Sequence, residues 1–245
     1  MRTRWVCPDA PLRSGVCLAA GLGLGAVGLL AVWARDWLGA GAGVPVVAMT
    51  VFATAMLLVA GAAGARHPFP RFGSANVVTT LRLVLVSLIA ALAMAPGTAR
   101  AAWLAVVVTA LVAILDGVDG WLARRSGLAS QFGARFDMET DALLILMLSV
   151  LVWSFDKAGW WVLACGWMRY AFVAAGWGLP WMSRPLSPTV RGKAVAVLQF
   201  VGLATALAPP VRPPVSEGVA ALTLAALAWS FAVDVARLWR AEGAG

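Results

Sequence analysis

Four aspartates within a short stretch are the residues best suited to chemistry in this sequence. Asp116 and Asp119 are three positions apart, and Asp137 and Asp141 are four apart. In helices, these spacings place each pair on one face. Four such carboxylates repel one another and need cations. With no histidine or cysteine beside them, the hard ions Mg²⁺ or Mn²⁺ are expected, and two ions about 3.5–4 Å apart would suit phosphoryl displacement.

Two glycines and an arginine accompany the aspartates. Gly120 and Gly133 lack side chains, so a flat ligand or a phosphate could approach the backbone there. Arg124 follows the first pair, where it could bind a phosphate oxygen. The structural alternative is a solvated loop in which the acids form salt bridges with Arg124, Arg125 and Arg135. Four acids at these spacings favour the metal site.

The composition predicts a membrane protein. Of the 245 residues, 62% are hydrophobic and 12% are charged, against about a quarter charged in soluble domains. This excludes a soluble enzyme, a disordered chain and a nucleic-acid-binding module. The net charge of +8 comes from cations placed singly between apolar runs, as in the loops of membrane proteins.

Eight apolar stretches are long enough to cross a membrane as helices, which predicts an all-α integral membrane protein. The stretches cover about residues 14–34, 43–65, 76–95, 101–122, 137–155, 159–179, 192–210 and 216–236. The match to GxGxxG at residues 23–28 lies inside the first stretch, so it indicates helix packing, together with Gly21 and Gly25, rather than dinucleotide binding.

The distribution of cations predicts the orientation. Placing the N-terminus in the cytoplasm puts Arg2, Arg4 and most other loop cations inside. Eight spans then bring both termini and the aspartates to the cytoplasmic side, and we expect the inner (plasma) membrane of a bacterium. His67, the only histidine, precedes Pro68 in a loop and is expected at the membrane interface rather than in chemistry.

Eight positions follow the pattern D-x2-D-G-x2-A-R-x8-G-x3-D-x3-D without a departure: Asp116, Asp119, Gly120, Ala123, Arg124, Gly133, Asp137 and Asp141. In this pattern the chain resembles the CDP-alcohol phosphatidyltransferase family. Asn76, Thr79 and Arg82 resemble the N-x-x-T-x-x-R of its first core helix. Gly192, Lys193 and Gln199 resemble a G-K-x-x-T-x-x-Q segment, in which Ala196 replaces the threonine; that departure concerns acceptor contacts.

The resemblance implies a six-helix core over residues 70–240, preceded by two transmembrane helices in residues 1–69. It implies that Asp116, Asp119 and Asp137 hold the metals and that Asp141 completes the site and acts as the base. It also implies a CDP pocket lined by Asn76, Thr79, Gly120, Ala123, Arg124 and Gly133. The implied reaction transfers a phosphatidyl group from CDP-diacylglycerol to an alcohol and releases CMP, in phospholipid biosynthesis. The family further suggests a homodimer.

The acceptor alcohol is open at this point. Four cations are expected on the cytoplasmic face: Arg135, Arg184, Arg191 and Lys193. They would suit a phosphorylated acceptor, such as glycerol 3-phosphate or an inositol phosphate, or they could serve only the positive-inside rule. Arg82, Arg169 and Asp234 lie within spans without an assigned role.

Two other functions are alternatives for an acidic cluster in a membrane protein. A membrane prenyltransferase also binds diphosphate through metals, but it requires two separated aspartate motifs. A cation transporter requires acids near mid-membrane and an internal repeat.

Overall fold

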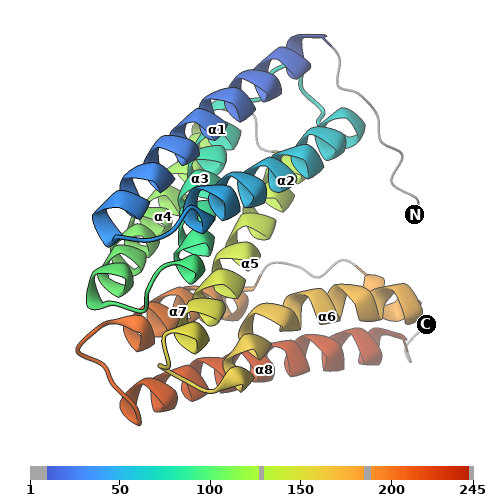
Figure 1. Ribbon diagram of the computed structural model, residues 1–245. Helices are drawn as coiled ribbons and strands as arrows, with labels where there is room; N and C mark the ends of the chain where they lie inside the picture. Colours follow the sequence, from blue (N-terminus) through green and yellow to red (C-terminus); the bar gives the residue numbers. More distant parts are fainter. Residues whose placement is uncertain (1–9, 127–129, 185–188, 243–245) are drawn as a thin grey trace. The chain divides into compact units, whose positions relative to one another are not determined.

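The computed structural model describes residues 10–126, 130–184 and 189–242, and over these residues the chain is entirely helical (Figure 1). The eight α-helices are α1 (Ala10–Leu38), α2 (Gly43–Arg66), α3 (Ser74–Ala91), α4 (Ala99–Ser126), α5 (Gln131–Ser154), α6 (Ala164–Gly178), α7 (Val190–Leu207) and α8 (Val215–Glu242). Three short 3₁₀ turns are η1 (Leu92–Met94), η2 (Trp160–Leu163) and η3 (Pro180–Ser183). Each of the eight predicted stretches therefore contains a helix. The predicted topology's terminal residues, Arg2 and Arg4 among them, lie outside the described part.

Six of the helices are long and apolar enough to cross a membrane: α1, α2, α3, α4, α7 and α8. The other two differ from the expectation of eight equivalent spans. The first half of α5 carries Asp137, Glu139 and Asp141, and α6 has only 15 residues. The predicted run 159–179 starts as the 3₁₀ turn η2, and its α-helical part begins at Ala164.

The described chain forms two compact units, residues 1–144 and 145–245, and each is described by itself. In the first unit, α3 packs against α1, α2 and α4 (Figure 1). It is the most enclosed of the six spans, with 67% of its apolar window buried. Two of its buried hydroxyls, those of Thr80 and Ser87, donate back into the helix, to the carbonyls of Asn76 at 2.8 Å and Leu83 at 2.7 Å, so these two need no partner from outside. A polar face of α3 is thus held inside the unit.

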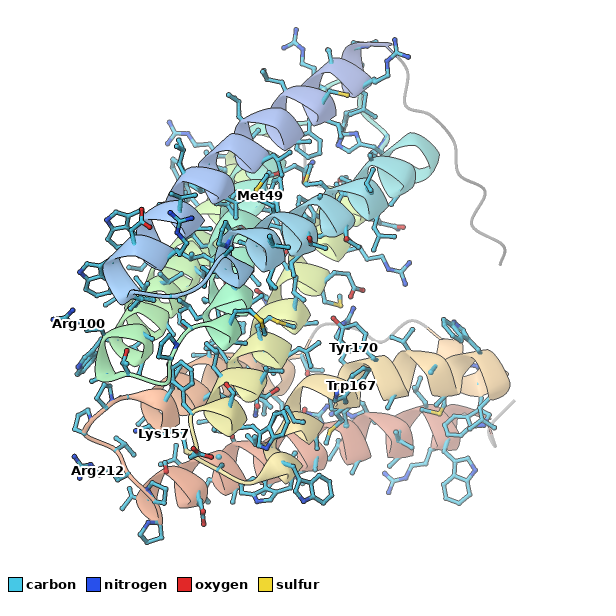
Figure 2. The ribbon with its side chains drawn as sticks, viewed as in Figure 1. Met49, Arg100, Lys157, Trp167, Tyr170 and Arg212 are labelled. Carbon is cyan, nitrogen blue, oxygen red and sulfur yellow. The ribbon has the colours of Figure 1, made fainter. Side chains whose placement is uncertain are left out.

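Close packing of α1 on α2 uses two glycines of the 23–28 motif, Gly23 and Gly28, as the helix-packing interpretation expects, but not Gly21 and Gly25. The ring of Phe52 in α2 lies where a side chain on Gly23 would be. Met49, also in α2, lies 3.8 Å from the Cβ position of Gly28 (Figure 2). A Cβ on Gly21 or Gly25 would meet no described atom within 4 Å. The contact between the two helices therefore runs along Gly23 and Gly28.

In the second unit, α7 and α8 pack closely around a buried glutamine. Gln199 donates to the carbonyl of Thr223 at 2.7 Å, and the methyl group of Thr223 fills the space beside Gly202. At the other end of α7, Lys157 donates to the carbonyls of Ala208 and Val211 at 3.1 and 2.6 Å, which satisfies acceptors just beyond the helix C-terminus.

Lys157 and Arg212 lie at the same end of the second unit (Figure 2). Burial, and to a smaller extent the charge of Arg212, lowers the pKa of Lys157. Through its hydrogen bonds to Ala208 and Val211, Lys157 joins the loop after α5 to the loop after α7.

Side-chain caps fix where two helices begin. Ser130 accepts a hydrogen bond from the amide of Gly133 at 3.0 Å, at the start of α5. Thr189 does the same for the amide of Gly192 at 3.1 Å, at the start of α7. Such caps satisfy amides that the first helical turn leaves without a partner. The cap at Ser130 therefore fixes the first residue of α5, and with it the positions of Asp137 and Asp141 along the helix.

The packing of α6 on α5 gives a stability prediction. A Cβ on Gly166 would lie 2.5 Å from the backbone Cα of Leu146, which cannot move aside as a side chain could. Gly166→Ala should therefore lower the free energy of unfolding by about 1–3 kcal/mol, measured as thermal denaturation in detergent. Gly218→Ala is the control, because a Cβ there meets no described atom within 4 Å. Equal melting temperatures for the two variants would contradict this packing.

Candidate active site

A single buried arginine, Arg82 of α3, lies among the four aspartates. Its side chain has no exposed surface. It forms ion pairs with Asp116 at 2.8 Å and with Asp119 at 2.6 Å, both from α4. It also forms ion pairs with Asp137 and Asp141, both from α5. Three helices of the first unit therefore meet at one guanidinium group.

The two terminal nitrogens of Arg82 divide the aspartates between them. Nη1 pairs with Asp119 and Asp137, and Nη2 pairs with Asp116 and Asp141. Each nitrogen thus joins one carboxylate of α4 to one of α5. The later residue of the α4 pair faces the earlier residue of the α5 pair, as expected for helices that run in opposite directions. The planar fork of an arginine suits this arrangement, whereas a lysine would offer only one nitrogen.

Thr79 adds a neutral donor to the deepest carboxylate. It lies one turn before Arg82 in α3, and its hydroxyl is 3.1 Å from Oδ2 of Asp119. The same hydroxyl is 3.1 Å from the carbonyl of Ala75. The hydroxyl has one proton, which it can donate to only one of these two oxygens at a time. Since the side chain of Asp119 is only 6% exposed, donation to its carboxylate, together with the ion pair from Arg82, helps to offset the cost of its burial.

The other three carboxylates are more exposed than that of Asp119, each to a different degree. The side chains of Asp116 and Asp137 are 42% and 37% exposed, and that of Asp141 is 23% exposed. A ligand can therefore reach Asp116 and Asp137 directly. Asp119 forms the closed end of the site.

These carboxylates fit a divalent ion. One oxygen each from Asp116, Asp119 and Asp137 lie within 4.8 Å of one another. Oxygens on opposite sides of one Mg²⁺ are about 4.2 Å apart, because each Mg–O bond is about 2.0–2.1 Å. The donor set contains only hard oxygen ligands, as Mg²⁺ and Mn²⁺ prefer. Among the described residues, Arg82 is the cation that pairs with these carboxylates, and it balances one of the four negative charges, so a strong demand for further positive charge remains.

The residues expected to bind CDP surround this cluster in the first unit. Asn76 and Thr79 are buried in α3, and Gly120, Ala123 and Arg124 follow Asp119 in α4. The guanidinium of Arg124 folds back over Gly120, 3.4 Å from the position that a Cβ would take.

On α5, the Cβ position of Gly133 lies 3.0 Å from Oδ1 of Asn76. A side chain at residue 133 would therefore crowd this amide, and a glycine leaves the space between α3 and α5 open. The turn expected between residues 125 and 133 includes residues 127–129, which lie outside the described part.

The four cations expected to bind the acceptor fall in different units. Arg135 is exposed on α5 in the first unit, while Arg184, Arg191 and Lys193 belong to the second. Arg191 forms an ion pair with Asp234 of α8 and lies 5.8 Å from the ring centre of Trp229. Asp234 is thus a partner of Arg191, which the sequence did not indicate. Arg184 and Lys193 are exposed.

The position of Arg82 is the main feature of the site that the sequence left open. A signal for it was present, because a charged residue inside a span needs a partner. The four aspartates were the natural candidates for this partner, because their negative charges outnumber the cations that lie near them in the sequence. What the sequence did not supply was the register of α3 against α4 and α5, which decides which cation enters the cluster.

An apolar helical chain with a carboxylate cluster that can hold metal defines a membrane protein with an acidic cation-binding site. The family model of the CDP-alcohol phosphatidyltransferases matches residues 72–235, about two thirds of the chain. The chain belongs to this family, and it is an enzyme that transfers a phosphatidyl group from a CDP-alcohol to an acceptor. No curated protein and no solved structure matches the chain. Family membership decides against the prenyltransferase and the transporter.

The ion pairs of Arg82 predict how metal and stability are linked. Arg82→Gln should unfold at a much lower temperature in EDTA, because four carboxylates then lack their cation; losing one partner of a buried ion pair costs about 3–5 kcal/mol. Added Mg²⁺ should raise the melting temperature of this variant more than that of the unaltered protein. Arg100→Gln, an exposed arginine at the start of α4, is the matched control. Equal Mg²⁺ responses in all three proteins would contradict this role for Arg82.

Proposed function

We propose that the protein transfers a phosphatidyl group from CDP-diacylglycerol to an alcohol and releases CMP. The observation that carries this proposal is the convergence of two carboxylates from α4 and two from α5, with Arg82 between them. A cluster so acidic cannot attract a diphosphate on its own. It can do so once cations outweigh the carboxylates, which suits a metal-dependent donor site.

The metals that we propose are two Mg²⁺ or Mn²⁺ ions, held by Asp116, Asp119 and Asp137, with Asp141 completing the site. When bound, such ions neutralise the diphosphate of the donor and stabilise the departing CMP. Thr79 and Arg82 hold Asp119 from the side of α3, so this ligand is fixed before a metal arrives.

Asp141 is proposed as the base. Its carboxylate is less exposed than those of Asp116 and Asp137, and Nη2 of Arg82 holds it. In the proposed step, Asp141 accepts the proton of the acceptor hydroxyl while that oxygen attacks the lipid-side phosphorus. The phosphorus–oxygen bond to CMP breaks, and CMP leaves with the bonding electrons. Arg82 steadies the carboxylate that gains the proton.

The CDP moiety is proposed to lie against Asn76, Thr79, Gly120, Ala123, Arg124 and Gly133. Because Gly120 and Gly133 lack side chains, the nucleotide could approach the backbone there, and Arg124 would contact a phosphate oxygen. Arg124 is exposed, so its guanidinium can turn from Gly120 to a ligand without leaving a buried charge unpaired.

For the acceptor, we propose a phosphorylated alcohol, either glycerol 3-phosphate or an inositol phosphate. The support is the cationic character of Arg135, Arg184, Arg191 and Lys193. Arg184 and Lys193 are exposed, and Arg191 is oriented by its ion pair with Asp234.

We also propose the arrangement in the membrane. All eight helices span it, with two N-terminal helices in residues 1–69 followed by a six-helix core in residues 70–240. The active site and both termini face the cytoplasm, and the protein forms a homodimer in the inner (plasma) membrane. The support for this orientation is the excess of loop cations on the side of the aspartates.

Nucleotide release tests the reaction. Purified protein with CDP-diacylglycerol and Mg²⁺ should release CMP with one acceptor from a panel that includes glycerol 3-phosphate, an inositol phosphate, free inositol and serine. EDTA should abolish the release, and Mn²⁺ or Mg²⁺ should restore it. Release with an unphosphorylated alcohol alone would contradict the proposed acceptor class. No release with any acceptor would contradict the donor.

The role of Asp141 can be separated from metal binding. Asp141→Asn should lower kcat at least a hundredfold, since general-base catalysis contributes about 10²–10⁴-fold. It should leave the Kd for CDP in Mg²⁺ within a few-fold of the original. Asp119→Asn, at the closed end of the site, should weaken Mg²⁺-dependent CDP binding and turnover together. The same loss of binding in both variants would make Asp141 chiefly a metal ligand.

A further inference from the structure

His67 lies outside the region that matches the family, in the segment between α2 and α3. It caps the end of α2, where its amide donates to the carbonyl of Ala63 at 3.0 Å. The family match begins at residue 72. Its side chain is half-buried and reaches α3, where its Nε2 is 3.3 Å from the amide nitrogen of Asn76.

The hydrogen bonds of Asn76 fix the direction of its amide. Its Nδ2 donates to the carbonyl of Phe72 at 2.5 Å, and a carbonyl can only accept. The amide nitrogen, rather than the oxygen, must therefore be on this side. Its second hydrogen points to Nε2 of His67, so both hydrogens of the amide are used.

The same geometry assigns the state of His67. Because the amide nitrogen of Asn76 can only donate, Nε2 of the histidine must be the acceptor, and the ring proton belongs on Nδ1. Nδ1 lies 2.9 Å from the carbonyl of Phe69, to which it donates in this tautomer. The backbone amide nitrogen of Phe69 lies farther away, 3.2 Å from Nδ1, and cannot donate to the protonated nitrogen. A neutral ring thus connects the loop after α2 to Asn76.

The ring also contacts the start of α5. Its centre lies 5.1 Å from that of Phe132, at an interplanar angle of 66°. The next residue is Gly133, whose Cβ position is 3.0 Å from Oδ1 of Asn76. With its nitrogen held on the other side, Asn76 presents this oxygen toward α5.

We propose that His67 is a positioning residue, which fixes the amide of Asn76 so that Oδ1 is offered to the nucleotide as an acceptor. This inference rests on the proposed function, in which Asn76 contacts CDP. The hydrogen-bond donors of CDP are its cytosine amine and its ribose hydroxyls. An acceptor oxygen held in one orientation can therefore bind one of these donors, whereas a rotated amide would present a second donor to it. Without His67, the hydrogen bond to the carbonyl of Phe72 is the remaining described contact that opposes a rotation of the Asn76 side chain, which would exchange Oδ1 for the donor Nδ2.

Two variants separate the acceptor of His67 from its ring. His67→Phe keeps an aromatic ring against Phe132 and removes the acceptor. His67→Gln loses the ring but can place an amide oxygen where Nε2 lies. In Mg²⁺, His67→Phe should weaken the binding of CDP about fivefold, the effect of one hydrogen bond of about 1 kcal/mol, and raise the KM for the CDP-lipid similarly at nearly unchanged kcat. His67→Gln should restore binding to within about twofold.

A double-mutant cycle with Asn76 completes the test. In an Asn76→Ala background, His67→Phe should change the Kd for CDP no further, because the amide that it orients is gone. Melting temperatures identify any variant that is merely misfolded. If the unaltered protein binds CDP and His67→Phe binds it equally well, or if the effect of His67→Phe persists without Asn76, the role of His67 is overturned. If the unaltered protein does not bind CDP in Mg²⁺, the proposed function falls, and this inference with it.

Discussion

The ion pairs of Arg82 with four aspartates are the interaction on which the first unit depends. An arginine with no exposed surface is costly to bury, by several kcal/mol, unless carboxylates surround it in good geometry. Conversely, the carboxylates of α4 and α5 repel one another without a cation between them. The ion pairs therefore stabilise both the buried arginine and the carboxylates, and they favour the register of the three helices in which they form. Selecting that register brings Asp116, Asp119, Asp137 and Asp141 to one place.

This constraint explains why α3 is the most enclosed span. A helix that must bring Arg82 to a cluster shared by α4 and α5 has to lie between other helices, and α1 and α2 pack against it as well. Thr79 is placed by the same helix, one turn before Arg82, and its hydroxyl reaches Asp119. Asn76 lies one turn earlier still. The three polar residues, at intervals of three, thus form one continuous face of α3.

Much of this could be predicted from the sequence, because it depends on local rules. Apolar run length predicted a helix in each of the eight stretches, and the spacing of the acids predicted two carboxylate pairs on facing helices. The 3₁₀ start of the segment before Ala164 could not be predicted, and neither could the identity of Phe52 as the partner of Gly23, since both depend on neighbouring helices. The ion pair of Arg191 with Asp234 escaped for the same reason. A charged residue within an apolar run indicates that a partner is needed. Which residue becomes the partner depends on the register of each helix against its neighbours.

The charge of the cluster also bears on the order of binding. Among the described residues, Arg82 is the one cation that pairs with the four aspartates, which therefore retain three negative charges when ionised. A CDP-lipid with two negative charges on its diphosphate is then repelled. The two divalent ions that we propose would reverse this to one positive charge, and the donor would bring the total to one negative charge. Metal binding must then come before donor binding, or accompany it. Departure of CMP removes negative charge from the site, so the ions would remain held by the carboxylates between turnovers, with Arg82 keeping the helices in register throughout.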